Sequence, residues 1–175
     1  MPDAAERALV SVATAYRYYR SADELWNAAV AYDAPGLDEA AVEAALAEAG
    51  DDVEARLEAV IAGFGFWMID NFDFTRRSAK AHLDSVFARQ ARGEAPSSDR
   101  PRRRTTWNAR VVEPLRGTVE DHHLDAVVEA LGLTWGPEPI ITLLDVLDLS
   151  PDAAKERMLT SARWLLRQGL AAAET

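Results

Sequence analysis

The side chains best suited to recognise another molecule gather near the start of the chain. Residues 11–20 hold three tyrosines, two arginines, a serine and a threonine among small apolar residues. These side chains suit the major groove of DNA, because Thr and Ala methyl groups can contact thymine methyls, Arg can reach guanine, and hydroxyls can reach phosphate. An ordinary amphipathic helix whose aromatic residues pack in a core is the alternative that the pattern leaves open.

Local signals place this segment on a short helix. Ser11 is a suitable N-cap for a helix that runs to Tyr19. A capping box begins at Ser21, with Glu24 three residues later, and predicts a further helix. On the first helix we expect an inward side of Val12, Ala15 and Tyr19 and an outward side of Ala13, Thr14, Arg17 and Tyr18, with Tyr16 between them.

Composition predicts an all-α fold for the 175 residues. Ala and Leu, which are strong helix formers, dominate the hydrophobic 49% of the chain, and Pro and Gly are sparse outside a few clusters. We expect roughly nine helices and no strand, among them one long helix that Asp51 and Asp52 cap and that runs to Ile69. Thr118 is predicted to cap a helix that ends at Leu131, and Ser150 to cap the last one.

Several classes of function are excluded or disfavoured. The chain has no cysteine, so disulfides, thiol nucleophiles and Cys-ligated zinc are excluded. It has no phosphate-binding, dinucleotide-binding, serine-hydrolase or zinc-protease motif, so we expect neither an enzyme nor a cofactor. His122 and His123 are neighbours about 100° apart on a helix, which disfavours joint metal binding. No apolar run reaches the length of a membrane span and no signal peptide is evident, so we expect a cytoplasmic location and no membrane.

Charge is distributed unevenly along the chain. The net charge of −10 argues against non-specific binding to nucleic acid. Residues 75–110 nevertheless carry ten Arg or Lys against three acids, whereas residues 1–32 carry three bases against four acids. The run Arg100, Arg102, Arg103 and Arg104 is interpreted as a solvated loop end, with a secondary contact to DNA or an acidic partner as the alternative.

The N-terminal stretch resembles the second half of the helix-turn-helix of the TetR family of transcriptional regulators. The family pattern reads V-S-x-x-T-x-Y-x-Y-F-x-S-K-E-x-L. The positions that match it here are Val10, Ser11, Thr14, Tyr16, Tyr18, Tyr19, Ser21, Asp23 and Leu25. The resemblance implies that Ala13, Thr14, Tyr16 and Arg17 face bases, that Tyr18 contacts the phosphate backbone, and that Tyr19 and Leu25 pack a small core.

The stretch also departs from the family pattern. Leu9 stands where the family has a turn glycine, and it would be strained if that position needs a positive φ. Ala22 replaces a lysine and Arg20 a proline. The first helix of the family's DNA-binding domain is absent, so we expect either a start codon upstream by about 15–30 residues or a truncated protein that binds a ligand or dimerises without binding DNA.

The C-terminal half resembles the same family more loosely. Residues 136–150 and 154–166 resemble the last two helices, which in the family pair with a two-fold mate in a four-helix bundle. The resemblance therefore implies a homodimer through the last two helices. It also implies a partial DNA-binding domain over residues 1–33 and a helical effector-binding and dimerisation domain over residues 34–175.

An aromatic-rich set on adjacent predicted helices completes the functional hypothesis. Core packing accounts for part of it, and an apolar effector cavity between helices is the alternative, which the family resemblance also implies. The residues expected to line the cavity are Phe64, Trp67, Met68, Phe72, Phe74 and Trp107. The whole pattern predicts a ligand-responsive repressor that binds a palindromic operator as a homodimer and releases it when a small apolar effector binds.

Overall fold

The described part of the chain is helical. The computed structural model describes residues 1–32, 36–94 and 102–173, which form α-helices with short π- and 3₁₀-helical segments. Within these ranges there is no β-strand, and one isolated bridge joins Arg116 to Val119. The all-α prediction is therefore confirmed. None of the helices in these ranges combines the length and the apolar character that crossing a bilayer requires.

The chain divides into two compact units. Unit 1 comprises Met1–Pro35 and Lys80–Arg100, and unit 2 comprises Gly36–Ala79 and Pro101–Thr175. Unit 1 contains α1 (Pro2–Arg7), α2 (Val12–Tyr18) and α3 (Ala22–Tyr32). The long helix α7 (Phe72–Ala91) begins in unit 2 and ends in unit 1. The functions expected of residues 1–33 and 34–175 remain predictions.

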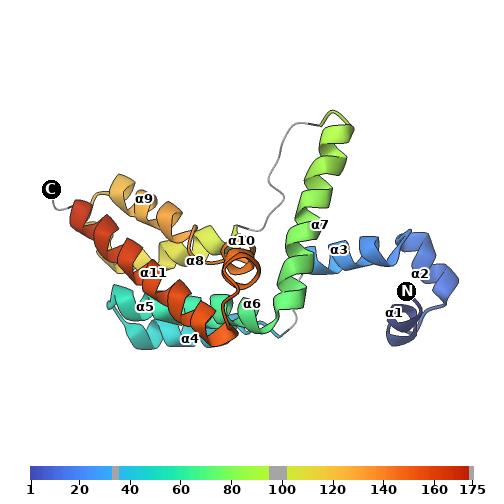
Figure 1. Cartoon of the computed structure of the whole chain (residues 1–175), viewed down its shortest axis with the longest axis horizontal. Coiled ribbons are helices and arrows are strands. Elements are labelled where there is room, and N and C mark those ends of the chain that lie inside the picture. Colours follow the sequence, from blue (N-terminus) through green and yellow to red (C-terminus); the bar gives the residue numbers. More distant parts are fainter. Residues whose placement is uncertain (33–35, 95–101, 174–175) are drawn as a thin grey trace. The chain divides into compact units, whose positions relative to one another are not determined.

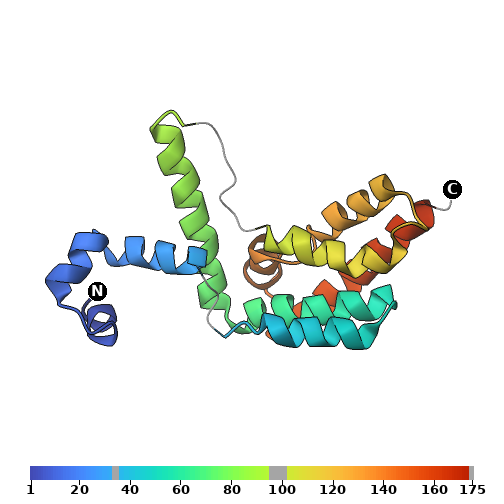
Figure 2. The same cartoon turned by 180° about the vertical axis from the view of Figure 1, so that it is seen from behind.

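Unit 2 is a helical bundle around one hydrophobic core. The neighbouring pairs are α4 with α5, α5 with α8, α8 with α9, and α11 with both α9 and α5 (Figures 1 and 2). The core includes Phe64, Trp107 and Trp135, which are all at most 5% exposed. These helices are α4 (Glu39–Ala49), α5 (Val53–Val60), α8 (Arg103–Val112), α9 (Asp121–Leu131) and α11 (Pro151–Ala172).

The long helix expected up to Ile69 is interrupted by a π-helical turn. After α5 the chain forms η1 (Ile61–Phe66) and then α6 (Trp67–Asp70). Two glycines in this turn meet neighbouring helices closely. A Cβ at Gly63 would lie 2.2 Å from a Val42 methyl, and a Cβ at Gly65 would lie 2.6 Å from the sulfur of Met158. The glycines therefore let α4 and α11 approach the turn.

A second π-helical turn interrupts the helix that starts at Gly136–Pro137. There α10 (Pro137–Ile141) continues directly as η3 (Thr142–Val146). In both places the hydrophobic periodicity of the sequence predicts an ordinary helix. A π-helical turn inserts one residue while the helix continues, so it leaves little trace in the pattern.

Helix caps account for most of the predicted helix starts. Ser11 and Ser150 accept hydrogen bonds from backbone N–H groups three residues later, as expected, and Asp52 caps α5. The prediction for Thr118 was wrong, because α9 begins at Asp121 and Glu120 is its N-cap. The Thr118 hydroxyl instead donates to the carbonyl of Leu115, which closes the turn after η2 (Glu113–Leu115).

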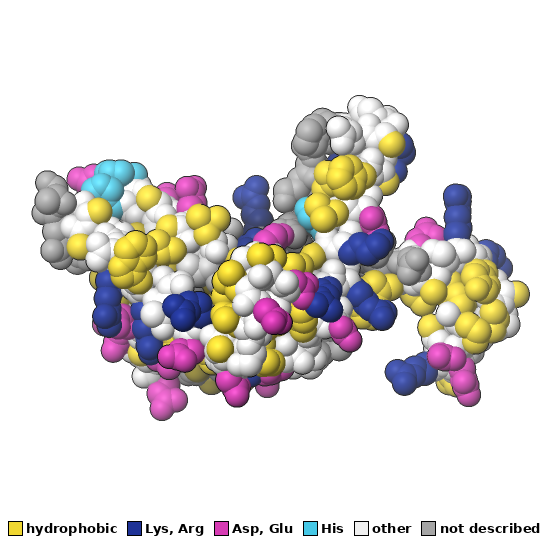
Figure 3. Space-filling model, viewed as in Figure 1, with side chains coloured by type: hydrophobic (Ala, Val, Ile, Leu, Met, Phe, Trp, Pro, Cys, Tyr) yellow, Lys and Arg dark blue, Asp and Glu magenta, His cyan; other side chains and the backbone are white. Residues whose placement is uncertain are grey.

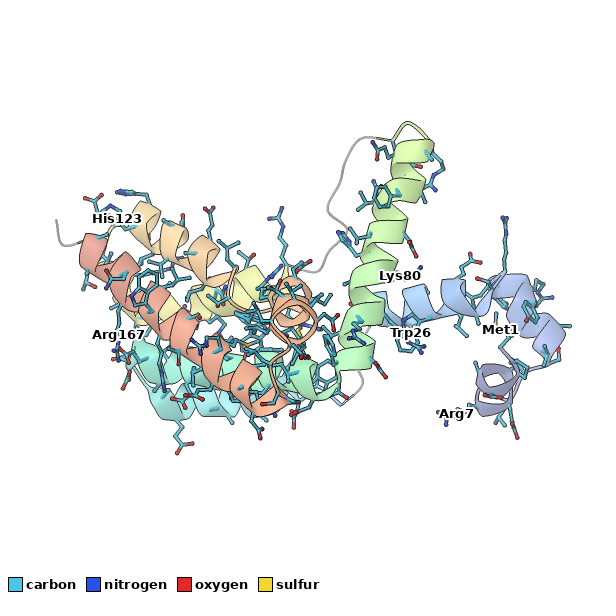
Figure 4. All side chains as sticks on the ribbon, in the orientation of Figure 1. Met1, Arg7, Trp26, Lys80, His123 and Arg167 are labelled. Carbon is cyan, nitrogen blue, oxygen red and sulfur yellow. The ribbon has the colours of Figure 1, made fainter. Side chains whose placement is uncertain are left out.

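Ion pairs join α11 to α5 along the surface of unit 2. Arg167 donates two hydrogen bonds of 2.6 Å to the carboxylate of Glu54, and Arg163 donates one of 2.6 Å to Glu58. The hydrogen bonds from Arg167 lower the pKa of Glu54 from its ordinary value near 4.5. Figure 4 shows Arg167 on α11 beside α5.

One buried side-chain pair ties α8 to the segment that follows α9. Asn108 is fully buried, and its Nδ2 donates to the carbonyl of Val128 at 3.2 Å. Its Oδ1 accepts a 2.9 Å hydrogen bond from the indole N–H of Trp135. Both polar groups of the amide are therefore paired inside the core, where an unpaired polar group is costly.

We predict that Asn108→Ala lowers the free energy of unfolding by about 2–3 kcal/mol, because it leaves the Trp135 N–H and the Val128 carbonyl without this partner. Urea unfolding measures the change. Thr105→Ala, at an exposed position of the same helix, is the control and should change stability little. Equal effects of the two substitutions would contradict the prediction.

Candidate nucleic-acid interface

A tight turn joins α1 to α2. The N–H of Leu9 donates to the carbonyl of Glu6 at 3.1 Å, and the N–H of Val10 donates to the carbonyl of Ala5 at 3.0 Å. Leu9 adopts a φ of +55° to make this turn. The backbone of Leu9 is therefore strained, because a residue with a Cβ is disfavoured in the left-handed region.

The N-terminus of α2 is held by its cap. Ser11 Oγ accepts a 3.0 Å hydrogen bond from the N–H of Thr14 and lies 2.8 Å from the Thr14 hydroxyl. The Thr14 side chain is half-buried and engaged with the cap, whereas Ala13, Tyr16, Arg17 and Tyr18 are exposed. Four of the five residues predicted to contact DNA are thus accessible to a partner.

Helix α2 buries little of its own surface. Ala15 and Tyr19 are partly buried, as expected of its inward side. Val12 was also expected to face inward, but it is 41% exposed. The physical reason is size, because helices of six and seven residues cover little, and Ala5 is the one buried residue of α1 and α2.

The turn and α2 carry only positive charge. Residues 7–20 contain Arg7, Arg17 and Arg20 and no Asp or Glu, in a chain whose net charge is −10. The guanidinium of Arg17 lies 5.4 Å from the centre of the Tyr18 ring. Figure 3 shows hydrophobic side chains gathered over α1 and α2, with Lys or Arg side chains and also Asp or Glu side chains at the margin. An exposed face of this kind complements a polyanion that also offers apolar groups.

Glu24, one of the first two acidic residues that follow α2 in the sequence, is used within the chain. The Glu24 carboxylate accepts a 2.5 Å hydrogen bond from the N–H of Arg20, and its own N–H donates to Ser21 Oγ at 3.0 Å. The predicted capping box at Ser21 is thus present in a modified form, because the carboxylate reaches Arg20 instead of Ser21. The pair anchors the start of α3.

The residues predicted to bind an effector are divided between two places in unit 2. Phe64 and Trp107 lie in the core, with ring centres 4.9 Å apart, and Phe64 also stacks on Trp135 at 5.7 Å. Trp67 packs edge-on against Phe74 at 5.4 Å. Met68 and Phe72 are partly buried against the core. Phe64 and Trp107 thus pack in the hydrophobic core. That they also line an effector cavity remains a prediction.

An open depression lies at the junction of α6 and α7. Its volume is about 470 Å³, and the five residues from Asp70 to Phe74 line it. The Arg76 guanidinium stacks over Phe72 at 4.2 Å and pairs with Asp145 of η3. Lys155 of α11 pairs with Asp70 at 2.6 Å. Phe72 and Phe74 are therefore the two predicted effector residues that border an accessible hollow.

The other charged motifs of the sequence serve as structural contacts. Arg103 pairs with Glu39 at 2.7 Å, and Arg104 donates to the carbonyl of Trp135 at 2.8 Å. Arg100 lies outside the described residues. The rings of His122 and His123 lie 4.0 Å apart, and in the described ranges no group of three or more potential ligands could hold a metal ion.

A second exposed surface lies on unit 2. In the described part of this unit, all the large hydrophobic side chains that are exposed fall between residues 133 and 164. Figure 3 shows hydrophobic side chains gathered over α10 and α11. The exposed residues are Leu133 (77%), Val146 (72%), Leu147 (55%) and Trp164 (63%). Exposed apolar surface of this kind is typical of a site that binds another protein surface.

Comparisons with protein-family models, with curated proteins and with solved structures found no match to this chain. Two surfaces of the described residues are accessible to a partner. One is the face of α2 that bears Arg17, and the other comprises the exposed apolar residues of unit 2, which lie after α9, at the end of η3 and on α11.

We predict that Leu9→Gly stabilises the α1–α2 turn by about 1 kcal/mol, because glycine adopts the left-handed conformation without a Cβ clash. Hydrogen exchange of the Ala15 and Tyr19 amides, which donate within α2, measures the effect. Leu9→Ala is the matched control and should change protection little, since the lost side chain is 93% exposed. Equal protection in both variants would refute a strained turn.

Proposed function

We propose that this protein is a DNA-binding transcriptional regulator, most simply a repressor, and that α2 is its recognition helix. The observation that carries the proposal is the exposed face of α2, which bears Arg17, two tyrosines and small residues and which Arg7 and Arg20 flank in a segment without an acid. Polyanion binding requires clustered positive charge, which residues 7–20 hold in an otherwise acidic protein. The resemblance of residues 10–25 to the TetR-type recognition helix supports the same assignment.

The side chains divide into two roles in this proposal. Ala13, Tyr16 and Arg17 contact base edges, where Arg reads guanine and a methyl group meets thymine. Tyr18 contacts the phosphate backbone and fixes the position of the helix. Thr14, which shares its hydroxyl with the Ser11 cap, offers its methyl group to a base.

Recognition of a palindromic operator requires two copies of the recognition helix. We propose that two chains associate through the exposed apolar residues of unit 2, which lie after α9, at the end of η3 and on α11, and of which Trp164 on α11 is the largest. A two-fold dimer places the same surface on both sides of the interface and presents two α2 helices to half-sites about one helical turn apart.

A small apolar effector completes the proposed mechanism. It would bind where Phe72 and Phe74 border the depression at the start of α7. In this proposal the ligand contacts the first turn of α7, a helix that begins in unit 2 and ends in unit 1. Such a ligand shifts DNA binding only through its difference in affinity between the two states of the protein.

We predict that Arg17→Ala weakens binding to DNA about tenfold or more, because it removes a side chain that reads a base edge, a contact with a value of about 1–3 kcal/mol. Duplexes selected from a random pool by the wild-type protein serve as targets, and fluorescence anisotropy across a salt series measures affinity. Tyr16→Ala should weaken binding as well. The control is Arg116→Ala, which removes an exposed arginine of unit 2.

The same experiment separates the proposal from its alternative, a ligand-binding or dimerising protein without DNA-binding activity. The acidic balance of the rest of the chain favours that alternative. If the selection enriches no sequence, or if Arg17→Ala and Arg116→Ala bind equally well, α2 is not a recognition helix and the proposal fails.

We predict that Trp164→Glu converts the dimer into a monomer, because it places a charge in an apolar interface. Sedimentation equilibrium measures the oligomeric state. Phe87→Glu is the matched control, since Phe87 is an aromatic residue on α7 with 64% exposure against 63% for Trp164. A Trp164→Glu dimer as stable as the wild type would place the interface elsewhere.

A further inference from the structure

Leu9 combines two unfavourable features: a backbone conformation that the two hydrogen bonds of the turn hold in place, and a side chain that the folded chain leaves uncovered. Its backbone has a φ of +55°, a conformation that costs a residue with a Cβ about 1–2 kcal/mol. Its side chain is 93% exposed, the highest value among the large hydrophobic residues of the described ranges. Residues with strained backbone conformations cluster at functional sites in proteins. A partner molecule that covers the Leu9 side chain would account for its exposure.

The neighbours of Leu9 extend this apolar surface. Val10 and Val12 are 42% and 41% exposed, and Tyr16 and Tyr18 follow on α2 with 49% and 69%. Residues 9–18 thus carry five of the eleven large hydrophobic side chains that are exposed in the described part of the chain. Exposed apolar groups so closely spaced define a contact surface and exceed the scatter expected of a small protein.

Charge decides which partner suits this surface. Arg7, Arg17 and Arg20 are all exposed, and no acid lies between them in the sequence. A purely apolar protein helix would leave these three guanidinium groups without counter-charges. The major groove of DNA offers phosphates at its edges and, at each thymine, a C5-methyl group on its floor. DNA therefore matches both the charge and the apolar character of the surface.

We infer that Leu9 and Val12 contact thymine methyl groups and so set a preference for A·T pairs at the positions that they reach. This inference rests on the proposed function, because it names how the same α2 surface selects its sequence. Leu9 is then a specificity-determining residue, and the strain of its backbone is the cost of presenting an isobutyl group beside the recognition helix.

Removal of single thymine methyl groups tests this inference. Each thymine of the selected duplex is replaced in turn by deoxyuridine, which lacks only the C5-methyl, and the affinity of the full chain is measured by anisotropy. At the contacted position we expect a loss of about fourfold, the value of one buried methyl group. In Leu9→Ala, which keeps a Cβ and the turn conformation, the same deoxyuridine replacement should cost nothing.

The control variant is Leu83→Ala, because Leu83 is an equally apolar, 53% exposed residue on α7. It should retain the full sensitivity to deoxyuridine. If the wild-type protein binds the selected duplex but no replacement weakens binding, or if Leu9→Ala keeps the wild-type sensitivity, the inference is overturned while the proposed function stands. If no duplex is selected at all, the proposed function fails first, and the surface then belongs to a protein partner.

Discussion

The close approach of helices at a glycine-containing π-helical turn is the constraint on which unit 2 depends. At Gly63 and Gly65 there is no room for a Cβ beside Val42 and Met158, so η1 packs directly against α4 and α11. Phe64, in the same turn, packs against Trp107 and Trp135. The indole N–H of Trp135 donates in turn to Asn108. Unit 2 therefore combines close approach at two glycines with aromatic packing and a buried hydrogen bond in one core.

In unit 1, the first two helices have few buried side chains and many exposed ones. They bury Ala5 and leave most of the α2 side chains exposed. Such a segment contributes little to stability through burial, since the favourable free energy scales with apolar area removed from water. Its residues are therefore available to a partner, and their charge and chemistry point to DNA. The stable core and the proposed recognition surface thus lie in different units of the chain.

Ion pairs and stacking complete the link between the depression and the bundle. Arg76 joins α7 to η3, and Lys155 joins α11 to the end of α6. Both cations also lie near aromatic rings, of Phe72 and Phe66 respectively. Exposed pairs of this kind stabilise little individually. Their position at the first turn of α7 makes them the contacts that a ligand in the depression would change.

The sequence by itself determined the helical class, the caps at Ser11 and Ser150 and the outward position of Ala13, Arg17 and Tyr18. These features depend on hydrogen bonds and periodicity within a few residues, so local patterns are sufficient to predict them. Only the tertiary structure decided the π-helical turns, the start of α9 at Asp121 and the exposure of Val12. The π-helical turns depend on how closely neighbouring helices approach them, the start of α9 on the turn in which Thr118 bonds to Leu115, and the exposure of Val12 on how little surface the short helices cover. The identity and spacing of residues along the chain do not encode these three outcomes.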